Sequence, residues 1–417
     1  MTRHGTVPRT DIRDGSGGGA TMGATTARRH ESGLLWASRP ALWTLTRITM
    51  SRPFGPIRRV PRLGWVASDP TLIRAVLNDH QHFTLLGEGG VGHLWEQVLG
   101  PYVTRLFDGP GHADLRRRAR DLFTEDNSAA LVERAAGPVY ADVTARLAAG
   151  DRVDVAAAAR LVVGRLMADL LGLQIPPDSP DSAYLDTFAA GERLAALALD
   201  TAASTELPPE RIEAAKEIVA SLTSGVPAAY AGADPDTLLG RCREAGITLE
   251  EASGLASLLL VAGTETAASA MARTIALIHD TGQQEPLLAD PGLVGDAVRE
   301  GLRVTTPAPV IGRHVSADVT VAGRRLRKDE RILLVTYAAD NLAGGFDLAR
   351  PYDPRSRQLW FGAGRHLCLG APVARAEIAR MVTAVRAPGR PYRIVSRSYA
   401  RKVMIPSYAS LVIELDR

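Results

Sequence analysis

The sequence predicts a mainly α-helical protein with a small β portion. Helical patterns of apolar residues follow one another from about residue 111 to residue 281, whereas short strand-like runs stand only before and after this stretch. The 417 residues are enough for one large domain or two, and no fixed-period repeat is visible among them. A helix-rich core with a few short strands is therefore expected.

The composition is that of an ordinary globular protein, with 46% hydrophobic and 23% charged residues. The net charge of +3 gives no reason to expect a nucleic-acid partner. Two cysteines are too few for a four-thiolate zinc or iron–sulfur site and argue against a disulfide-stapled secreted protein. The N-terminus has no apolar signal region, and no apolar run suggests a membrane span. We therefore expect a cytoplasmic protein that does not bind a membrane.

Residues 1–33 are expected to be a disordered tail, because their glycines, threonines and arginines offer little apolar surface to bury. Residues 34–417 are expected to form one domain. A strand at 63–68 leads into a helix that opens at Asp69-Pro70, and the glycine-rich stretch 85–102 is expected to be a long loop with a short helix. Further helices are predicted at 111–122, 129–147, 155–171, 182–199, 209–224 and 236–245, and later strands at 319–321, 331–335, 393–395 and 411–415.

Cys368 stands in the most informative segment of the chain. Residues 361–370 read Phe-Gly-Ala-Gly-Arg-His-Leu-Cys-Leu-Gly, and an apolar helical face that ends at Ala387-Pro388-Gly389 begins directly afterwards. At a helix N-terminus, free N–H groups favour a thiolate, which acts as a nucleophile or as a metal ligand. Because His366 stands close in the sequence, a Cys–His hydrolase is one alternative on these local grounds.

A long helix is predicted from a capping box at Thr248 to about His279. Its middle reads Ala-Gly-Thr-Glu-Thr at residues 262–266, an unfavourable run for a buried helix interior because glycine and β-branched threonine lower helix propensity. One interpretation is a local opening of the helix that brings Glu265 and Thr266 beside a ligand. The other is a packing notch at Gly263 with Glu265 facing solvent.

A third pattern, Glu300 and Arg303, places an acid and a base three residues apart on a helix, where they can pair. Together the three patterns resemble the cytochrome P450 family. Residues 361–370 fit the haem-ligand signature Phe-Gly-x-Gly-x-His-x-Cys-Leu-Gly at every fixed position, residues 262–266 resemble Ala-Gly-x-(Asp/Glu)-Thr, and the third pattern resembles Glu-x-x-Arg. The resemblance extends from about residue 35 to the end of the chain and implies the cytochrome P450 fold, with the long helix crossing the haem.

The resemblance implies haem b as cofactor and one cytochrome P450 catalytic domain over residues 34–417. It makes Cys368 the thiolate ligand of the iron, gives Glu265 and Thr266 a role in proton delivery, and leaves room for dioxygen at Gly263. His366 then becomes a partner of a haem propionate, which removes the base that a hydrolase would need. The expected cofactor-binding residues are His112, Arg116, Arg313, His366, Phe361, Gly362, Gly370 and Ala262, with Glu300 and Arg303 as a structural pair.

The resemblance also implies a monooxygenase that inserts one oxygen atom from dioxygen into a small organic substrate. Its electrons would come from a separate ferredoxin or flavodoxin and an NAD(P)H-dependent reductase, and a basic face of Arg117, Arg120, Arg365 and Arg375 would receive the acidic donor. The chain is expected to be a monomer, and bacterial secondary metabolism is its expected setting. Oxidative coupling, desaturation, peroxide-driven chemistry and a non-catalytic haem sensor or carrier are the alternatives. The candidate substrate-pocket residues are Leu94, Leu259, Val310, Ile311 and Tyr408.

One segment departs from the family pattern. Where the family usually carries two arginines, this chain has Asn341 and Pro351. The second of these arginines normally joins the Glu-x-x-Arg pair in a buried network. Arg350 is one position away and is a candidate substitute, and weaker haem retention or lower stability is the hypothesis that this departure raises.

Overall fold

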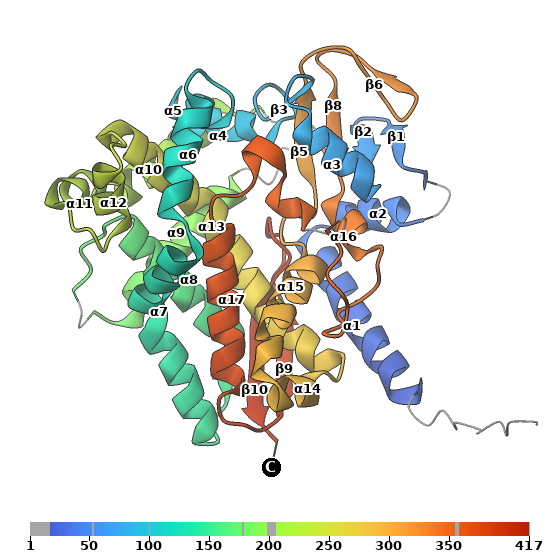
Figure 1. Cartoon of the computed structure of the whole chain (residues 1–417), viewed down its shortest axis with the longest axis vertical. Coiled ribbons are helices and arrows are strands. Elements are labelled where there is room, and N and C mark those ends of the chain that lie inside the picture. Colours follow the sequence, from blue (N-terminus) through green and yellow to red (C-terminus); the bar gives the residue numbers. More distant parts are fainter. Residues whose placement is uncertain are drawn as a thin grey trace, which may run out of the picture.

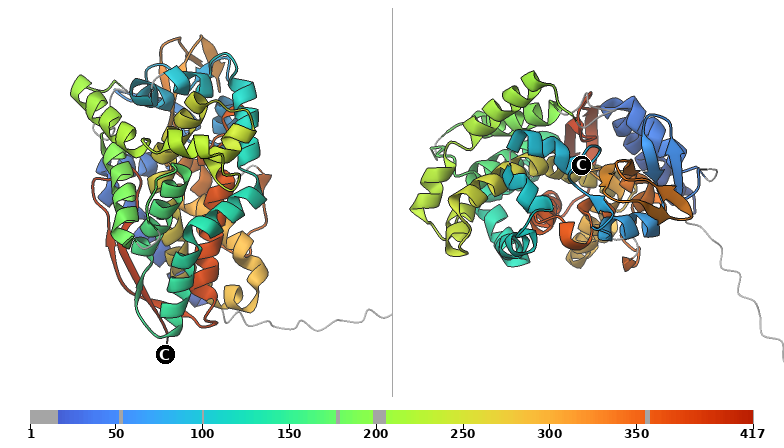
Figure 2. Two further views of the ribbon diagram at one scale, coloured as in Figure 1. Left: turned by 90° about the vertical axis from the view of Figure 1, so that its left-hand side faces the viewer. Right: turned by 90° about the horizontal axis from the view of Figure 1, so that it is seen from above.

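The computed structural model describes residues 17–51, 54–99, 101–176, 179–197, 206–354 and 358–416. Within them, helices form most of the molecule; the strands of the largest sheet lie at the upper right, whereas β9 and β10 lie at the bottom near the C-terminus (Figure 1). Seen from above, helices α6 to α12 lie on one side, while α1 to α3 and the largest sheet lie on the other (Figure 2). The predicted fold class, mainly α with a small β portion, is confirmed. The helices are α1 Gly17–Ser38, α2 Pro40–Thr49, α3 Pro70–Asn78, α4 Val91–Leu99, α5 Pro101–Phe107, α6 His112–Leu122, α7 Glu125–Ala148, α8 Val155–Leu170, α9 Asp181–Ala196, α10 Pro209–Leu222, α11 Val226–Gly232, α12 Leu238–Glu244, α13 Leu249–Asp280, α14 Gln284–Ala289, α15 Val294–Thr305, α16 Thr336–Asn341 and α17 Ala371–Arg386.

The strands form three small sheets. The largest has the order β1-β2-β8-β5-β3, and only its β2–β8 pair is parallel. The second has the order β4-β10-β9, and β6 pairs with β7 in a two-stranded ribbon. The first two sheets join segments that are far apart in the sequence, whereas the β6–β7 ribbon is local. The strands are β1 Ile57–Val60, β2 Gly64–Ala67, β3 Phe83–Thr84, β4 Val153–Asp154, β5 Ile311–Val315, β6 Val319–Val321, β7 Arg324–Leu326, β8 Arg331–Leu334, β9 Tyr392–Tyr399 and β10 Tyr408–Leu415.

Helix α13 is the central element of the helical core. The Thr248 side chain accepts a hydrogen bond from the N–H of Glu251, whose carboxylate accepts one from the N–H of Thr248, so the predicted capping box is present. The helix packs against α8, α15 and α17. Among the described residues α13 is long and apolar enough to cross a membrane, but most of that stretch is buried inside the protein, as in the core helix of a soluble protein.

The expectation of a disordered tail up to residue 33 is wrong from residue 17 onward, where α1 begins; residues 1–16 lie outside the described residues. Ala27 and Leu34 are buried in the main core, and the buried Glu31 pairs with Arg273, which is also fully buried on α13. The polar composition concealed this packing because the partner of Glu31 lies 242 residues further along the chain. Burying a charge is tolerated only with such a partner.

The stretch 85–102 also has more regular structure than the long loop with one short helix that its glycines suggested. Gly87 and Gly89 adopt the left-handed backbone conformation, which glycine tolerates best, and α4 and the start of α5 follow them. The helices predicted between residues 111 and 245 are present with shifted ends, and α11 adds a helix that the sequence did not predict. The last residues of the helix predicted at 182–199 lie outside the described part of the chain.

Candidate functional site

The loop that carries Cys368 is held in one conformation by its glycines. It contains two short 3-10 turns, Leu359–Phe361 and Gly364–His366, and it closes with a 2.7 Å hydrogen bond from the N–H of Cys368 to the carbonyl oxygen of Phe361. Gly362 and Gly364 have φ angles of 78° and 59°, and a Cβ at Gly364 would lie 2.6 Å from the Asn78 side chain. The loop therefore requires glycine at both positions and delivers Cys368 to the N-terminus of α17.

The Cys368 thiol faces a hollow in the protein. Its side chain is exposed, yet burial among the surrounding protein atoms is the largest cause of a raised pKa for this thiol. Both observations hold, because a cavity of about 460 Å³ is lined by Cys368 together with His112, Arg116, Phe361 and Leu367. Hydrogen bonds from the backbone N–H groups of Gly370 and Ala371, and the charge of Arg116, act against the effect of burial and favour the thiolate.

Two histidines that the sequence singled out lie side by side next to this cavity. The rings of His112 and His366 are 5.2 Å apart between centroids. His112 uses Nδ1 for a 2.6 Å hydrogen bond with the carbonyl oxygen of Leu106, so its buried Nε2 has no hydrogen-bond partner among the described residues. His366 uses Nε2 for a 2.6 Å hydrogen bond with the carbonyl oxygen of Phe107. His112 thus presents a free ring nitrogen, whereas His366 already binds the segment before α6.

Asp108 is a residue of this region that sequence reasoning missed. Its carboxylate lies 3.3 Å from His366 Nε2, pairs with Arg365 and accepts a hydrogen bond from the N–H of Leu85. Burial acts to raise the pKa of Asp108, but the hydrogen bond from His366 and the other contacts outweigh it and leave this pKa lowered. The residues around Asp108 carry no signal for this contact, because His366 lies more than 250 positions further along the chain.

The other two predicted cofactor-binding cations are Arg116 and Arg313. Arg116 donates a hydrogen bond to the carbonyl oxygen of Leu367, the residue before Cys368. Arg313 on β5 is buried and donates to the carbonyl oxygen of its neighbour Gly312 at 2.8 Å. Burial lowers the pKa of Arg313 to about 10, and the charge of Asp108 acts in the opposite direction. A buried guanidinium that donates to one neutral carbonyl is a site that an anionic group would stabilise.

The middle of α13 does not open as one interpretation suggested. The helix is continuous through residues 262–266, and Thr266 donates a 2.9 Å hydrogen bond from its hydroxyl to the carbonyl oxygen of Ala262. Ala262 is exposed although it lies at the centre of a core helix. A Cβ at Gly263 would lie 3.0 Å from the methyl carbon of Met167 on α8, so the structure gives this glycine a packing reason. The Ala262 side chain is exposed and that of Thr266 is partly exposed, so neither is fully covered by protein atoms.

Glu265 projects away from solvent toward the C-terminal segment. Its Oε2 accepts a 3.1 Å hydrogen bond from the N–H of Ile405. Burial raises the pKa of Glu265 to about 7 and the nearby Glu192 acts in the same direction, while the Ile405 N–H and the charge of Arg39 act against them. The expectation of a solvent-facing Glu265 is therefore wrong. A carboxyl group with a pKa near neutrality can both release and take up a proton.

Glu300 and Arg303 pair as predicted and are both buried on α15. The two hydrogen bonds between them measure 2.7 and 2.9 Å, and Arg303 also donates to the carbonyl oxygens of Asp340, Gly344 and Gly345. Arg350 completes this network through a 3.1 Å hydrogen bond from Nε to Glu300 Oε2. Arg350 thus supplies the second arginine that the sequence lacks at Pro351.

The five candidate substrate-pocket residues do not gather in one place. Leu94 on α4 and Leu259 on α13 both pack against the main core, and these two helices are in contact. Val310 packs against the apolar clusters around Phe54 and Leu35, and Ile311 packs against the core of the largest sheet. Tyr408 is buried, with its ring near that of Tyr399. Leu94, Leu259 and Tyr408 therefore belong to or pack against the main core, whereas Val310 and Ile311 pack against other clusters.

Comparisons with known proteins agree with this fold and site. The family profile described as Cytochrome P450 matches residues 276–385, from the second half of α13 to the end of α17. Cytochrome P450-SU2 of Streptomyces griseolus is 31% identical over 340 residues, which are 75% of this chain and 77% of that protein. Shorter matches cover 37% of the putative cytochrome P450 YjiB of Bacillus subtilis, at 35% identity over 34% of this chain, and 33% of the pentalenic acid synthase of Streptomyces avermitilis, at 37% identity over 31% of this chain. These two matches span about a third of the length of each relative.

Solved structures share the fold. The complex of P450BioI with an acylated acyl carrier protein has a TM-score of 0.70 at 20% identity, over 93% of this chain and 100% of that one. A mutant of P450 EryK with erythromycin B has a TM-score of 0.70 at 23% identity, over 91% of this chain and 97% of that one. These structures show the fold, and the 31% identity to Cytochrome P450-SU2 over 75% of this chain and 77% of that protein shows that the chain belongs to the cytochrome P450 family. Its cofactor is haem b, and its class is that of the monooxygenase oxidoreductases.

The residues present fit this cofactor. The buried guanidinium of Arg313 calls for an anionic partner, which the propionates of haem b carry. Because His112 Nδ1 already bonds the Leu106 carbonyl, its unpaired Nε2 would donate to a propionate only in the protonated ring, and this carboxylate would act against the burial that lowers the pKa of His112. The exposed thiol of Cys368 in its hollow and the exposed Ala262 in mid-helix leave surface that a flat apolar ligand would cover. His366 fits less directly, because Phe107 and Asp108 already occupy its Nε2.

Proposed function

We propose that this protein is a haem-thiolate monooxygenase that inserts one oxygen atom from dioxygen into a small organic substrate. The observation that carries the proposal is Cys368 itself. It stands just before α17, the backbone N–H groups of Gly370 and Ala371 act to lower the pKa of its thiol, and it lines a hollow with His112 and Arg116. Haem ligated by a thiolate supplies dioxygen activation, because the thiolate donates electron density to the iron.

The residues proposed to hold the haem divide into a ligand, anion partners and a cover. Cys368 would ligate the iron, and His112, Arg116 and Arg313 would bind the propionates through charge-assisted hydrogen bonds. Phe361 packs in the main core, stacks on Trp360 and lines the hollow, so it would limit the access of water to the sulfur. In place of a propionate contact, His366 would fix the loop to the segment before α6.

Proton handling is assigned to two residues of α13. Glu265 is half-buried beside the N–H of Ile405 with a pKa of about 7, so its carboxyl can hold or release a proton at neutral pH. The Thr266 hydroxyl bonds the Ala262 carbonyl on the exposed part of the helix and can donate toward a ligand after a rotamer change. Gly263 is not assigned a part in this step, since its close neighbour is Met167.

The substrate is proposed to be an apolar or partly polar small molecule, because Leu94, Leu259 and Ala262 are apolar. A role in bacterial secondary metabolism is supported by the similarity to pentalenic acid synthase and to the structure of EryK with erythromycin B. The electrons are proposed to come from a ferredoxin or flavodoxin and its reductase, and the enzyme is proposed to act in the cytoplasm as a monomer.

The proposal is tested by optical spectroscopy of the reduced protein in carbon monoxide. The wild-type protein is expected to show the strongly red-shifted Soret band of thiolate-ligated haem, and Cys368→Ala is expected to lose it. Cys242→Ala is the matched control, because Cys242 is buried in α12 outside the site. A Cys368→Ala protein that keeps the band would disprove the assignment of Cys368 as the ligand. If the protein binds haem but turns over no substrate when it is reconstituted with redox partners, a haem carrier would be favoured instead.

A further inference from the structure

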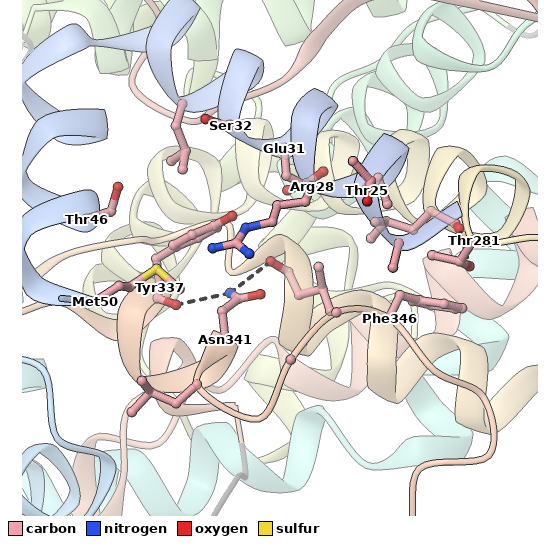
Figure 3. A pocket seen from close by; sticks show the side chains of 18 of the residues that line it. Thr25, Arg28, Glu31, Ser32, Thr46, Met50, Thr281, Tyr337, Asn341 and Phe346 are labelled. Atoms are coloured by element: carbon pink, nitrogen blue, oxygen red, sulfur yellow. Dashed lines mark hydrogen bonds between the residues drawn. The ribbon is translucent and has the colours of Figure 1, made fainter. Parts of the chain in front are cut away.

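A second cavity, which shares no lining residue with the hollow of Cys368, lies between the two N-terminal helices and the body of the protein. Its volume is about 610 Å³, within the range of small-molecule sites. Helices α1 and α2 form one wall, and the end of α13, the end of α15, α16 and residues 342–346 form the other (Figure 3). None of the residues proposed above to bind haem or substrate lines it. We call this cavity the N-terminal pocket.

The walls of the N-terminal pocket are largely apolar. Leu35 and Met50 line it from the N-terminal helices, and Leu277, Val304 and Phe346 line it from the body of the protein. Leu342 is also part of the lining and is 55% exposed, so an apolar side chain stands at its edge. Such walls favour the apolar part of a ligand, since each apolar surface removed from water contributes to binding.

One cation reaches into the N-terminal pocket. The side chain of Arg28 extends from α1 toward Tyr337 and Asn341 (Figure 3), and it has no hydrogen bond or ion pair with another residue that the structure describes. Glu31 also lines the pocket, but its carboxylate is bound on both oxygens by the buried Arg273. Arg47 adds a second positive charge, 5.6 Å from the centroid of the Trp43 ring. The uncompensated charge of the pocket is therefore positive.

Two polar groups stand next to Arg28. Asn341 uses its Nδ2 for hydrogen bonds to the carbonyl oxygens of Val304 and Tyr337, at 3.2 and 3.0 Å, which orients its side-chain oxygen toward the pocket (Figure 3). The Tyr337 hydroxyl makes no hydrogen bond to another described residue, and burial raises the pKa of this phenol, so it remains a neutral donor. A guanidinium beside a phenol hydroxyl is a donor set that matches a carboxylate.

We propose that the N-terminal pocket binds an amphipathic carboxylate, whose head group pairs with Arg28 and the Tyr337 hydroxyl and whose apolar body fills the space between α2, α13 and α15. Such a ligand would join the N-terminal helices to the segment 342–346. Gly344 and Gly345 of this segment line the pocket and accept hydrogen bonds from Arg303 on their carbonyl oxygens. Occupancy is therefore expected to stabilise the whole protein, since a ligand that binds only the native state raises its stability.

The test uses decanoate as the probe and the purified full-length protein as isolated. Binding is measured by equilibrium dialysis, and the Soret band is recorded in the same samples. Decanoate in the N-terminal pocket is expected to bind without a Soret change, whereas decanoate next to the haem would shift that band. Some decanoate is expected to bind without changing the Soret band. Arg28→Gln is expected to weaken this binding by at least about tenfold, in line with the loss of a charge-assisted hydrogen bond. Arg28→Lys is expected to weaken it less, because it keeps the charge and loses the planar fork.

Arg29→Gln is the matched control, because Arg29, like Arg28, is exposed on α1 but does not line the pocket. Decan-1-ol, which lacks the charge, is expected to bind weakly to both the wild-type protein and Arg28→Gln, with the same affinity for each. The proposal is overturned if Arg28→Gln and Arg29→Gln bind decanoate equally, or if all bound decanoate shifts the Soret band. Equilibrium dialysis requires no catalysis, so the carboxylate proposal is tested independently of the monooxygenase proposal.

Discussion

At the scale of single residues, Glu265 is the clearest case of a side chain tuned by its surroundings. It lies beside the N–H of Ile405, with Arg39 as the nearby cation and Glu192 as a second carboxyl group on α9. Burial also raises the pKa of Glu192, and Arg160 acts against it. One partly compensated carboxyl group facing another is an arrangement in which a proton is readily shared or passed on.

The raised pKa of Glu265 predicts a pH-dependent difference in stability between the wild-type protein and Glu265→Gln. The pKa is about 7 in the folded protein and 4.5 in the unfolded chain. The folded state therefore binds the proton more tightly, and the stability that this proton contributes is lost as the pH rises from about 4.5 through about 7. Because glutamine does not titrate, Glu265→Gln is expected to gain stability relative to the wild-type protein over this window.

The measurement is the urea midpoint of both proteins at several pH values between about 5 and 8. Glu210→Gln, an exposed change on α10, serves as the control and should follow the wild-type curve. Parallel curves for Glu265→Gln and the wild-type protein would show that Glu265 has an ordinary pKa, and the proton-handling role proposed for it would then lose its support.

At the scale of elements, α15 and the segment 343–350 form one unit held by charge. Glu300 is bound by Arg303 from its own helix and by Arg350 from the segment. Arg350 also donates to the carbonyl oxygens of Ala343 and Gly345, at 2.8 and 2.9 Å. The departure from the family pattern at Pro351 is thus compensated one position earlier, and the hypothesis of a poorly supported Glu300–Arg303 pair loses its structural basis.

Removal of Arg350 is expected to weaken this unit. Arg350→Ala leaves two carbonyl oxygens and one carboxylate oxygen of Glu300 with fewer donors, which we expect to cost about 1–3 kcal/mol of unfolding free energy. Both the melting temperature and the haem content after purification should fall. Arg350→Lys should restore little, because a single ammonium group cannot reach all three partners in the geometry of the guanidinium.

Arg324→Ala is the control for this experiment, since Arg324 is exposed on β7 and belongs to no ion pair among the described residues. Full haem occupancy together with an unchanged melting temperature in Arg350→Ala would mean that Arg303 alone supports Glu300. The arginine that the family pattern usually carries would then be dispensable in this chain.

At the scale of the whole molecule, the sequence predicted local features well and contacts between distant segments poorly. The capping box of α13, the start of α17 after Cys368 and the Glu300–Arg303 pair each depend on residues within a few positions of one another. The burial of α1 depends on Glu31 meeting Arg273, and the position of His366 depends on Asp108. Such contacts are fixed only when the chain folds, so no local pattern reveals them.

The basic face that was expected to receive an electron donor is less positively charged than its arginines suggested. Arg117, Arg120, Arg365 and Arg375 all line the hollow of Cys368, as a docking face for an electron donor requires. Each of them, however, has an acidic neighbour: Asp114, Asp121, Asp108 and Glu125, respectively. The net charge of the face is therefore smaller than the arginines alone suggested, and electrostatic attraction of an acidic donor is expected to be moderate.

Arg120 offers the sharpest test of this face, because it is 71% exposed and its contact with Asp121 is long, at 3.8 Å. We expect Arg120→Glu to slow reduction of the haem by a ferredoxin roughly two- to fivefold at low ionic strength, because a repulsive charge reduces productive encounters. The difference from the wild-type protein should shrink as salt is raised, since the screening length falls from about 10 Å at 0.1 M to about 3 Å at 1 M. Stopped-flow reduction across this salt range measures both effects.

Arg324→Glu introduces the same charge change on β7, outside the hollow, and should leave the rate near that of the wild-type protein. Equal slowing by the two variants would show that only net charge matters and that the donor does not dock beside Cys368.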